Sequence, residues 1–539
     1  MRNIQLLDCT LRDGGYVNDW EFGHDTLLSV FQRLVLAGVD LIEVGFLDER
    51  RPYDSNRSIF PDTKSVDKIW DGIDKGSSMA VGMIDFGTCP IENLQPCSES
   101  YLDVIRVIFK KEKMHAAMEY CREVKKLGYK VCSQLVSVTA YNDEELLQLI
   151  ELVNDVKPYA VSMVDTYGLL DPTWLLHIYS ILDAHVDKDI AIGFHAHNNL
   201  QLGYANARAF VAKETDRAIL VDGTLFGMGK SAGNAPLELV AKYLNEEFGR
   251  HYDINAMMEA IDESVNQFYA KSPWGYKTFF YTSSLNKCHP NYVQYYQNKG
   301  SLSPTKLNKI LSEIEPYPKK LLYDEKLAEE LYQKFVSEEF HDEEEFRKLS
   351  EMFAGKNILL IGPGKNIVLQ KDKVEKYIAE KHPVKIAINY IPEIMDVDYI
   401  FLTKPNRYEQ MTTALQGVDV KVIATSNMET KNEPFDYVLN REPLLEKTGK
   451  IKDNSFLMLL QILQNAGVKQ VACAGLDGYS AREDNYASPE MEYGFVKKEA
   501  DYLNEHIKDV LHHKYSDMQI EFITFSQYNV VQDISSGTF

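Results

Sequence analysis

The stretch Leu6-Leu7-Asp8-Cys9-Thr10-Leu11-Arg12-Asp13-Gly14-Gly15 has the pattern of a buried strand that runs into a loop. The loop sets a cation, Arg12, beside a carboxylate, Asp13. Arg-Asp-Gly also occurs in ordinary surface turns, where glycine supplies a backbone conformation that other residues avoid. The stretch alone leaves a functional loop and a plain turn both open. We take the first half of the chain to be built around it.

Short apolar runs alternate with amphipathic segments as far as about residue 240, which is typical of repeated strand and helix units. Eight such units over about 240 residues match the size of a (β/α)₈ barrel, the TIM barrel. A doubly wound open sheet of similar size is the structural competitor. The predicted strands are 4–9, 39–46, 79–84, 104–109, 130–135, 160–164, 190–194 and 218–221. Helices are predicted over 25–37, 113–127, 143–156, 172–184 and 202–215, where apolar residues recur three and four apart.

The chain changes character after residue 250. An aromatic-rich segment is followed by helices full of Lys and Glu, and short apolar strands bounded by turn residues then return. We therefore predict an α/β protein with a TIM-barrel domain at 1–250, a helical extension and linker at 251–350, and a smaller Rossmann-like parallel α/β domain at 351–539. The strands expected in this last domain are 357–361, 385–388, 399–402, 421–424 and 470–473.

Length and charge set the class of protein. A chain of 539 residues exceeds the size of a single hydrophobic core, so two or more domains are expected. The formal charge of -22 argues against a nucleic-acid or anionic-membrane surface, although a local basic pocket for an anionic metabolite stays open. No apolar run approaches the roughly 18 residues of a transmembrane helix, and no signal-peptide core is found, so we expect a cytoplasmic protein. Whether it forms a homo-oligomer is left open.

The seven cysteines include no CxxC pair, and they predict no disulfide framework. We expect most of them to fill the core. Cys9 lies beside the opening motif, where a reactive role is conceivable, but a small buried residue on the first strand is the favoured interpretation.

Glu43 is a carboxylate inside the otherwise apolar strand Leu41-Ile42-Glu43-Val44-Gly45-Phe46. A buried glutamate needs a partner. One interpretation is a structural ion pair with Arg12, and the other is that this pair positions Arg12 toward a substrate. The two are compatible.

His195 and His197 follow the seventh predicted strand in Gly193-Phe194-His195-Ala196-His197. Alternate residues of a strand point to the same side, so the two imidazoles are expected to project together. With a carboxylate from the first strand they would make a two-histidine, one-carboxylate metal site with open positions. A lone histidine on a strand is more often a satisfied core or surface residue, but two at this spacing on the catalytic edge of a barrel favour metal. Mn²⁺, Co²⁺, Fe²⁺ and Mg²⁺ all suit such a mixed nitrogen and oxygen site.

A glycine-rich loop, Gly223 to Pro236, follows the eighth predicted strand and leads into a helix. Such a loop can present backbone N–H groups to an anion, and this corner of a barrel often holds phosphate. A P-loop is excluded, because Thr224 stands where its first glycine is needed. Asn234 is placed to reach the metal or its ligand, and its alternative role is a helix cap.

Taken together, residues 3 to about 300 resemble the DRE-TIM metallolyases, a superfamily of metal-dependent aldolases, lyases and synthases. Its three name-giving residues match Arg12, Asp13 and Glu43, and its His-x-His and Gly-Asn motifs match His195, His197 and Asn234. The resemblance implies a divalent metal, Mn²⁺ first and Mg²⁺ or Co²⁺ as alternatives, on Asp13, His195, His197 and Asn234. It also implies a 2-oxo acid and an aldehyde as small-molecule partners.

Within this superfamily the spacing is most similar to the 4-hydroxy-2-oxovalerate aldolases. The similarity includes Val164-Asp165-Thr166 and the run from Gly227 to Glu238, and it implies substrate-binding roles for Thr166 and Gly229. The segment from Tyr281 to His289 resembles the aldolase segment that bears a catalytic tyrosine, and we carry that role to Tyr281 beside catalytic roles for Arg12 and Glu43.

One departure concerns the proton. The aldolases have a histidine two residues after Gly14, proposed as their base, and this chain has Tyr16 there. A phenol with a pKa near 10 is a poorer base at neutral pH than an imidazole. Three alternatives stay open: Tyr16 is a catalytic residue that acts differently, a bound water or His24 takes the place of the base, or the substrate is not that of the aldolases.

The leading hypothesis is therefore metal-dependent aldol cleavage or addition through the enolate of pyruvate or a related 2-oxo acid. The nearest rival is a Claisen-type acyl-CoA synthase such as isopropylmalate synthase, although this chain has Arg-Asp-Gly-Gly-Tyr where those synthases commonly have Arg-Asp-Gly-Glu-Gln. A third hypothesis is a degenerate barrel that serves as a binding protein.

The C-terminal domain carries a weaker signal. Gly362 and Gly364 form a glycine turn after a strand, a position where α/β domains commonly bind phosphates or nucleotides. The third glycine of the dinucleotide fingerprint is missing, and a plain structural turn stays open. Together with Asp477 this region faintly resembles domains associated with bacterial surface glycans. We expect a nucleotide or nucleotide-sugar here, and with it a speculative role in surface polysaccharide biosynthesis.

Overall fold

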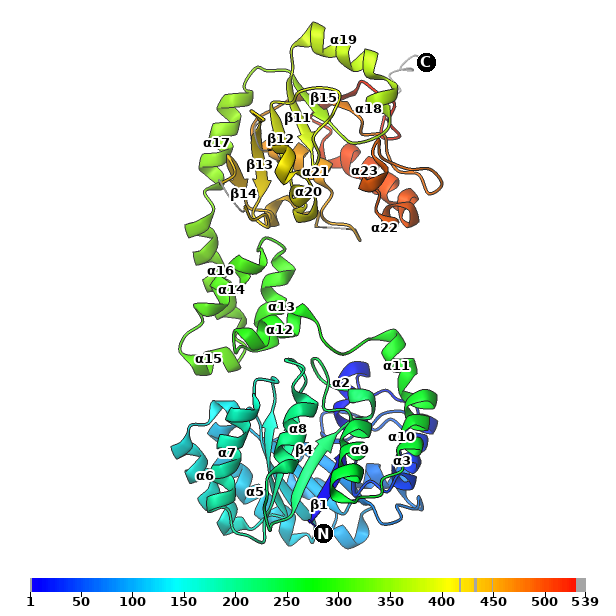
Figure 1. The fold of residues 1–539 in the computed structure, drawn as a ribbon, viewed down its shortest axis with the longest axis vertical. Coiled ribbons are helices and arrows are strands. Elements are labelled where there is room, and N and C mark those ends of the chain that lie inside the picture. The colour runs from blue at the N-terminus through cyan, green and yellow to red at the C-terminus, as the bar shows by residue number, and fades with distance from the viewer. Residues whose placement is uncertain (1, 416–417, 431–433, 448, 530–539) are drawn as a thin grey trace, which may run out of the picture. The chain divides into compact units, whose positions relative to one another are not determined.

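The computed structural model describes residues 2–415, 418–430, 434–447 and 449–529. Contacts divide the chain into two compact units (Figure 1). The first, called here the barrel unit, comprises Met1–Val293 and Ile314–Tyr323, and the second, the C-terminal unit, comprises Gln294–Glu313 and Asp324–Phe539.

The barrel unit contains the predicted (β/α)₈ barrel. All its strand pairs are parallel, in the order β1-β9-β8-β7-β6-β5-β4-β2, and the pairing of β1 with β2 closes the ring and excludes an open sheet. Closure puts the carboxyl ends of all these strands at one end of the barrel. The strands are β1 (Ile4–Asp8), β2 (Leu41–Leu47), β4 (Met79–Asp85), β5 (Val104–Phe109), β6 (Lys130–Leu135), β7 (Ala160–Asp165), β8 (Ala191–Ala196) and β9 (Ile219–Gly223). A two-residue strand, β3 (Ile59–Phe60), adds to β2 and was not predicted.

Helices alternate with the strands and bury their apolar faces against them. The five predicted helices are confirmed with ends shifted by a few residues, as α3 (His24–Leu36), α5 (Met114–Lys126), α6 (Asp143–Val156), α7 (Pro172–His185) and α8 (Gly203–Ala212). Two more are α4 (Thr63–Trp70) and α9 (Leu237–Phe248). Polar caps fix where helices begin: the Asn142 side chain accepts from the N–H of Glu145 in a capping box, and Asp171 caps α7 directly before Pro172.

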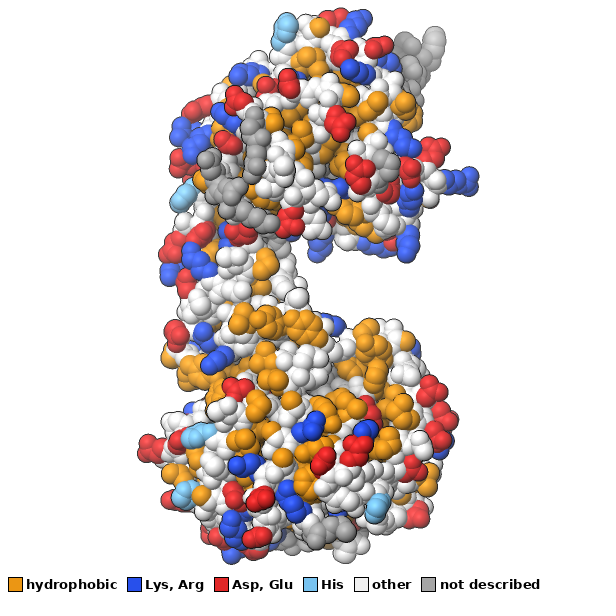
Figure 2. Space-filling view, in the orientation of Figure 1, with side chains coloured by type: hydrophobic (Ala, Val, Ile, Leu, Met, Phe, Trp, Pro, Cys, Tyr) orange, Lys and Arg blue, Asp and Glu red, His pale blue; other side chains and the backbone are white. Residues whose placement is uncertain are grey.

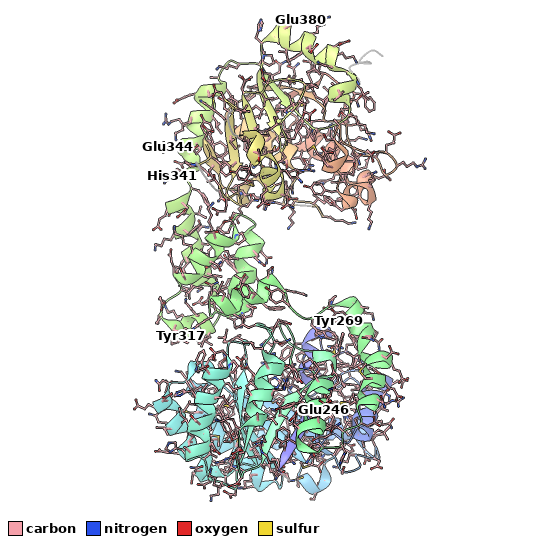
Figure 3. The ribbon with its side chains drawn as sticks, viewed as in Figure 1. Glu246, Tyr269, Tyr317, His341, Glu344 and Glu380 are labelled. Atoms are coloured by element: carbon pink, nitrogen blue, oxygen red, sulfur yellow. The ribbon has the colours of Figure 1, made fainter. Side chains whose placement is uncertain are left out.

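Helices fill the region after the barrel, and they are divided between the two units. In the barrel unit, α10 (Ile254–Ala260) packs on α3, Tyr269 of α11 (Asn266–Lys271, Figure 3) contacts the ring of Phe226, and Ser284 of α12 (Thr278–Leu285) donates to the Tyr167 carbonyl. Tyr167 in turn donates from its hydroxyl to the carbonyl of Leu321 in α15 (Tyr317–Leu321). The remaining helices are α13 (Pro290–Lys299), which spans the division, and α14 (Pro304–Ser312), α16 (Glu325–Glu339) and α17 (Asp342–Phe353) in the C-terminal unit.

The C-terminal unit holds a second parallel sheet in the order β14-β13-β12-β11-β10-β15-β16. Both faces of β10 are buried, because Ile358 and Leu360 enter one hydrophobic cluster and Leu359 and Ile361 enter another. The strands are β10 (Ile358–Ile361), β11 (Val384–Ile388), β12 (Tyr399–Leu402), β13 (Lys421–Thr425), β14 (Tyr437–Leu439), β15 (Gln470–Ala474) and β16 (Gln519–Phe522). The helices are α18 (Asn366–Leu369), α19 (Lys371–Lys381), α20 (Pro405–Leu415), α21 (Ser455–Asn465), α22 (Gly494–Lys498) and α23 (Ala500–Lys514).

The surface charges and the cysteines agree with the expectations from composition. Acidic and basic side chains are interspersed on the face shown in Figure 2. All seven cysteines are free thiols, and six of them are buried. Among the described residues, no helix is both long enough and apolar enough to cross a membrane.

Candidate active site

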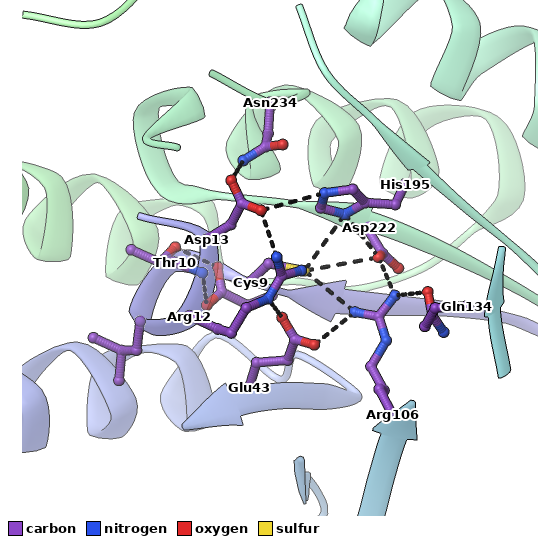
Figure 4. Close-up of polar contacts among 12 residues, drawn as sticks. Cys9, Thr10, Arg12, Asp13, Glu43, Arg106, Gln134, His195, Asp222 and Asn234 are labelled. Atoms are coloured by element: carbon purple, nitrogen blue, oxygen red, sulfur yellow. Dashed lines mark hydrogen bonds and ion pairs between the residues drawn. The ribbon is translucent and has the colours of Figure 1, made fainter. Parts of the chain in front are cut away.

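Side chains from four strand ends meet at the carboxyl end of the barrel (Figure 4). Arg12 and Asp13 lie on α1 (Thr10–Asp13), a single helical turn where a loop was predicted, directly after β1. Glu43 comes from β2 and His195 from β8. His197 follows β8, where a backbone bridge pairs it with Asn234 of the loop after β9. All six side chains are buried.

Asp13, His195 and His197 are close enough to share one metal ion. Their potential ligand atoms all lie within 4.8 Å of one another, and His195 Nε2 is 3.6 Å from Asp13 Oδ2. Asn234 joins them, because its Nδ2 donates to Asp13 Oδ1 at 3.0 Å.

Three atoms around Asp13 lack hydrogen-bond partners. His195 Nε2, His197 Nδ1 and Asn234 Oδ1 are buried, and none has a partner among the described residues. Buried polar atoms are rarely left unpaired in native proteins, so such atoms call for a missing ion or ligand. A carboxylate, two imidazole nitrogens and an amide oxygen fit a divalent cation.

The protonation states of Asp13 and His197 also suit a cation. Burial lowers the pKa of His197 to about 3, so its imidazole stays neutral and keeps a lone pair. Burial alone would raise the pKa of Asp13, but the Arg12 guanidinium and the two imidazoles hold it well below its usual range. The carboxylate is therefore ionised at every pH at which the protein would work.

An ion-pair network behind the cluster fixes the orientation of His195. Its Nδ1 donates to Asp222 Oδ2 at 3.0 Å, which leaves Nε2 directed at Asp13 (Figure 4). Asp222 also accepts from Arg106, and Arg106 Nη1 donates to Glu43 Oε1 at 2.8 Å. Our sequence reasoning missed Arg106 and Asp222, although the signal was available: each is a charged residue inside an apolar strand, as Glu43 is.

Arg12 is held between two carboxylates. Its Nε donates to Glu43 Oε2 at 2.7 Å and its Nη1 to Asp13. For its Nη2, no partner is found among the described residues. These contacts raise the pKa of the Arg12 guanidinium, even though burial alone would lower it. Glu43 thus pairs with Arg12, as predicted, and bridges it to Arg106.

Tyr16 lies at the rim of the cluster. The residue is 43 % exposed, and its ring packs edge-on against Trp20, with ring centroids 4.9 Å apart. Desolvation and the charge of Asp13 raise the pKa of the Tyr16 phenol to about 12. The hydroxyl stays protonated at neutral pH, so Tyr16 is suited to donate a hydrogen bond or a proton.

Lys230 stands next to Tyr16 and had no predicted role. Its backbone N–H donates to Asp13 Oδ1 at 2.9 Å, and its ammonium lies 5.3 Å from the centroid of the Tyr16 ring. Burial lowers the pKa of His289 to about 4, and the positive charges of Lys230 and Lys110 contribute to this shift. This part of the barrel end therefore combines positive charge with a neutral imidazole.

The other predicted barrel residues have different surroundings. A side chain at Gly229 would overlap those of Asn234 and Asp13, so only glycine lets the loop approach the cluster this closely. Thr166 follows β7, and its Oγ1 accepts from the Ser137 N–H at 2.7 Å. Tyr281 lies on α12 and is exposed, with its ring near Tyr276, and no contact to the cluster is found for it within the described part of the chain.

The structure brings together the three residues predicted in the C-terminal domain, Gly362, Gly364 and Asp477. The backbone N–H groups of the two glycines, however, already donate hydrogen bonds within the protein. Gly362 N–H donates to the Ala474 carbonyl and Gly364 N–H to the Gly475 carbonyl, both at 2.8 Å. Asp477 Oδ2 accepts from the Asn366 N–H at 2.8 Å, where a phosphate on the turn would bind. The glycines let two loops pack closely, since side chains at either position would overlap the loop after β15.

Comparison with known proteins concerns the barrel. Residues 3–263 match the model of the HMGL-like family. The 4-hydroxy-2-oxovalerate aldolase of Pelotomaculum thermopropionicum is 28% identical over 260 residues, which are 48% of this chain and 75% of the relative. The enzyme of the same name from Chloroflexus aurantiacus is 27% identical over 270 residues, 49% of this chain and 76% of the relative.

Solved structures resemble part of the chain as well. The N-terminal domain of a putative aldolase from Bacteroides vulgatus is 23% identical, with a TM-score of 0.46, and the match covers 54% of this chain and 96% of that domain.

Proposed function

Because residues 3–263 form an HMGL-like domain of the DRE-TIM superfamily, we propose that the protein is a divalent-metal-dependent aldolase. It makes or breaks a carbon–carbon bond through the enolate of pyruvate or a related 2-oxo acid. The observation that carries the proposal is the set of three unpartnered buried atoms, His195 Nε2, His197 Nδ1 and Asn234 Oδ1, around the ionised carboxylate of Asp13.

Asp13, His195, His197 and Asn234 would hold the ion. When bound, a divalent ion supplies Lewis-acid polarisation of the carboxylate and carbonyl oxygens of a 2-oxo acid. Mixed nitrogen and oxygen donors suit Mn²⁺, Mg²⁺ and Co²⁺, and we place Mn²⁺ first from the family resemblance. Cys9 lies behind His195, and burial raises the pKa of its thiol well above the usual range, so the thiol is neutral in the metal-free protein.

Arg12 supplies positive charge at the substrate oxygen that becomes negative. Its Nε and Nη1 are tied to Glu43 and Asp13, so the guanidinium is oriented before substrate arrives. Glu43 acts on the reaction through Arg12, and Arg106 in turn holds Glu43. A preorganised cation of this kind stabilises developing charge without moving during the reaction.

The partner of the aldehyde oxygen in this proposal is Tyr16. Since its phenol stays protonated, Tyr16 donates to that oxygen as a carbon–carbon bond forms. With its pKa raised to about 12, the phenol is a poor base for the cleavage direction, and we propose that another group takes that proton. From the family resemblance, Thr166 and Gly229 remain proposed substrate-binding residues and Tyr281 a proposed catalytic residue.

A direct test is a metal-replacement assay. The purified protein is stripped with a chelator, reloaded separately with Mn²⁺, Mg²⁺ and Co²⁺, and screened with pyruvate against a panel of aldehydes. The proposal predicts product only after reloading and none from His195→Ala. Activity that survives chelation, or that His195→Ala leaves unchanged, would sink the proposal. Free thiol released from acetyl-CoA with 2-oxo acids would point to a Claisen-type synthase instead.

A further inference from the structure

The sheet of the C-terminal unit has a topological switch point between β10 and β15. The chain goes from β10 outward through β11 and β12 on one side, and it returns later to add β15 on the other side. Loops that leave neighbouring strands in opposite directions open a crevice at the carboxyl edge of the sheet, where ligands of open α/β sheets bind.

A cavity of about 150 Å³ lies at this edge. Residues that follow the carboxyl ends of β10, β11, β12 and β15 line it, together with the residues that lead into α21. A smaller cavity of about 50 Å³ shares Pro363, Tyr479 and Tyr486 with it and adds Asp477. The two cavities are described as one cleft below, the switch-point cleft.

The switch-point cleft contains a buried arginine whose charge is not neutralised. Arg407 is only 6 % exposed, and the groups around its guanidinium are neutral: the Met491 carbonyl, Gln410 Oε1 at 3.4 Å and the Tyr493 ring at 4.6 Å. No carboxylate among the described residues lies within ion-pair distance of it. Because burying an unpaired charge is unfavourable, Arg407 calls for an anion from outside the chain.

A second cation lines the same cleft. Lys404 pairs with Asp453, but this carboxylate also accepts from Arg441 Nη2 at 2.9 Å. Lys404 and Arg441 thus share one carboxylate, and Arg407 pairs with none among the described residues. An incoming anion would meet net positive charge, and a guanidinium binds a phosphate through two parallel hydrogen bonds.

The rest of the cleft offers apolar and hydrogen-bonding surface. Tyr479, Tyr486, Tyr493 and Phe495 present aromatic rings to it. Asp477 Oδ1 is buried and has no partner within the described part of the chain, so it can accept from a ligand hydroxyl or amine. A ligand that satisfies all these groups carries an anion, a flat ring and hydrogen-bond donors.

We propose that the switch-point cleft binds a nucleoside phosphate, with the phosphate at Arg407 and Lys404 and the nucleoside along the tyrosines toward Asp477. The glycine turn at Gly362 and Gly364 does not bind the phosphate, because its amides donate to the last residue of β15 and to the first residue of the loop after it. The turn instead forms a wall of the cleft. This site stands independently of the chemistry proposed for the barrel.

The test is calorimetric titration of the full-length protein with AMP, GMP, CMP and UMP. The four matching nucleosides and inorganic phosphate are titrated separately for comparison. The proposal predicts that at least one nucleotide binds at least about tenfold more tightly than its nucleoside and than phosphate. Phosphate binding as tightly as every nucleotide would overturn the nucleoside assignment, and no binding at millimolar nucleotide would overturn the whole proposal.

Variants locate the binding. Arg407→Gln and, separately, Lys404→Gln should each weaken nucleotide binding, the first by at least about tenfold. The matched control is Arg347→Gln, which removes an exposed arginine paired with Glu351 on α17 and should leave binding unchanged. Lys404→Gln keeps the test decisive if Arg407→Gln fails to fold. Unchanged binding in the folded variants would refute the site.

The barrel variant His195→Ala should bind nucleotide as the wild type does. Failure of the aldolase proposal therefore leaves this result unaffected, and nucleotide binding lost in His195→Ala would contradict the assignment to the cleft.

Discussion

Asp222→Asn is the sharpest perturbation of the proposed metal site, because it changes one charge without altering any of the four side chains proposed to bind the ion. Asp222 Oδ2 accepts both from His195 Nδ1 and from Arg106, while its Oδ1 is buried without a partner among the described residues. An asparagine with its oxygen in the place of Oδ2 can keep both hydrogen bonds. Its amide group then occupies the partnerless place of Oδ1, and the negative charge that makes His195 a better ligand is gone.

The expected effect is a loss of metal affinity. Removing a group that holds and polarises a metal-binding histidine typically costs 10- to 100-fold in affinity, about 1.4 to 2.7 kcal/mol. Mn²⁺ binding to the stripped protein, measured by titration calorimetry, should weaken by this factor while the stoichiometry stays the same. Thermal unfolding in the absence of metal checks that the variant is folded.

The matched control is Asp183→Asn. Asp183 pairs with the buried Arg217 in the same barrel, and Arg217 also donates to four backbone carbonyls. This substitution should lower stability modestly and leave Mn²⁺ affinity unchanged. Equal Mn²⁺ affinity in folded Asp222→Asn and wild type, or an equal loss in both variants, would refute the role given to Asp222.

Three further predictions concern the proton, the glycine loop and stability. Tyr16→Phe should lower kcat in steady-state aldol assays with little change in KM for the 2-oxo acid, because it removes the donor to the aldehyde oxygen; an unchanged kcat would exclude that role. Gly229→Ala should weaken Mn²⁺ binding in calorimetry, because the added methyl overlaps the metal-binding side chains, whereas Gly494→Ala, which meets no atom within 4 Å, should not. Burial raises the pKa of Asp8 from 3.8 to about 7, so the folded state holds a proton that the unfolded state has lost between these values. The free energy of unfolding should then fall as pH rises through this window. Urea unfolding at a series of pH values measures this dependence, which should be weaker in Asp8→Asn than in the wild type.

The barrel could be predicted because its strands are buried on both faces and therefore form nearly continuous apolar runs. The strands that were missed lack this signal. Two are very short, β3 at Ile59–Phe60 and β14 at Tyr437–Leu439, and the residues of β16 are half-buried or exposed. Such strands form because a neighbouring strand offers unpaired backbone groups, and this is a property of the folded sheet.

The candidate site was only partly visible in the sequence. Arg12, Asp13, His195 and His197 stand in short motifs at strand ends, where spacing carries information. Arg106 and Asp222 each stand out as charged residues in apolar strands, but they are 116 positions apart, and no local sequence pattern predicts their contact.

The protonation of Tyr16 and the hydrogen bonds of the glycine amides could not be predicted from the sequence either. The pKa of Tyr16 depends on how the fold desolvates the phenol and places it near Asp13. The amides of Gly362 and Gly364 turned out to be paired with the last residue of β15 and the first residue of the loop after it, which follow more than a hundred residues later in the chain.

The central claim, enolisation of a 2-oxo acid at a divalent-metal site, is tested most directly by proton exchange. Pyruvate is incubated in D₂O with the Mn²⁺-loaded protein, and loss of its methyl proton signal is followed by NMR after the paramagnetic metal is removed. The account predicts exchange that requires metal, exceeds the protein-free rate and disappears in His195→Ala. Protein that binds Mn²⁺ at this site and yet leaves the pyruvate methyl group unexchanged would contradict it.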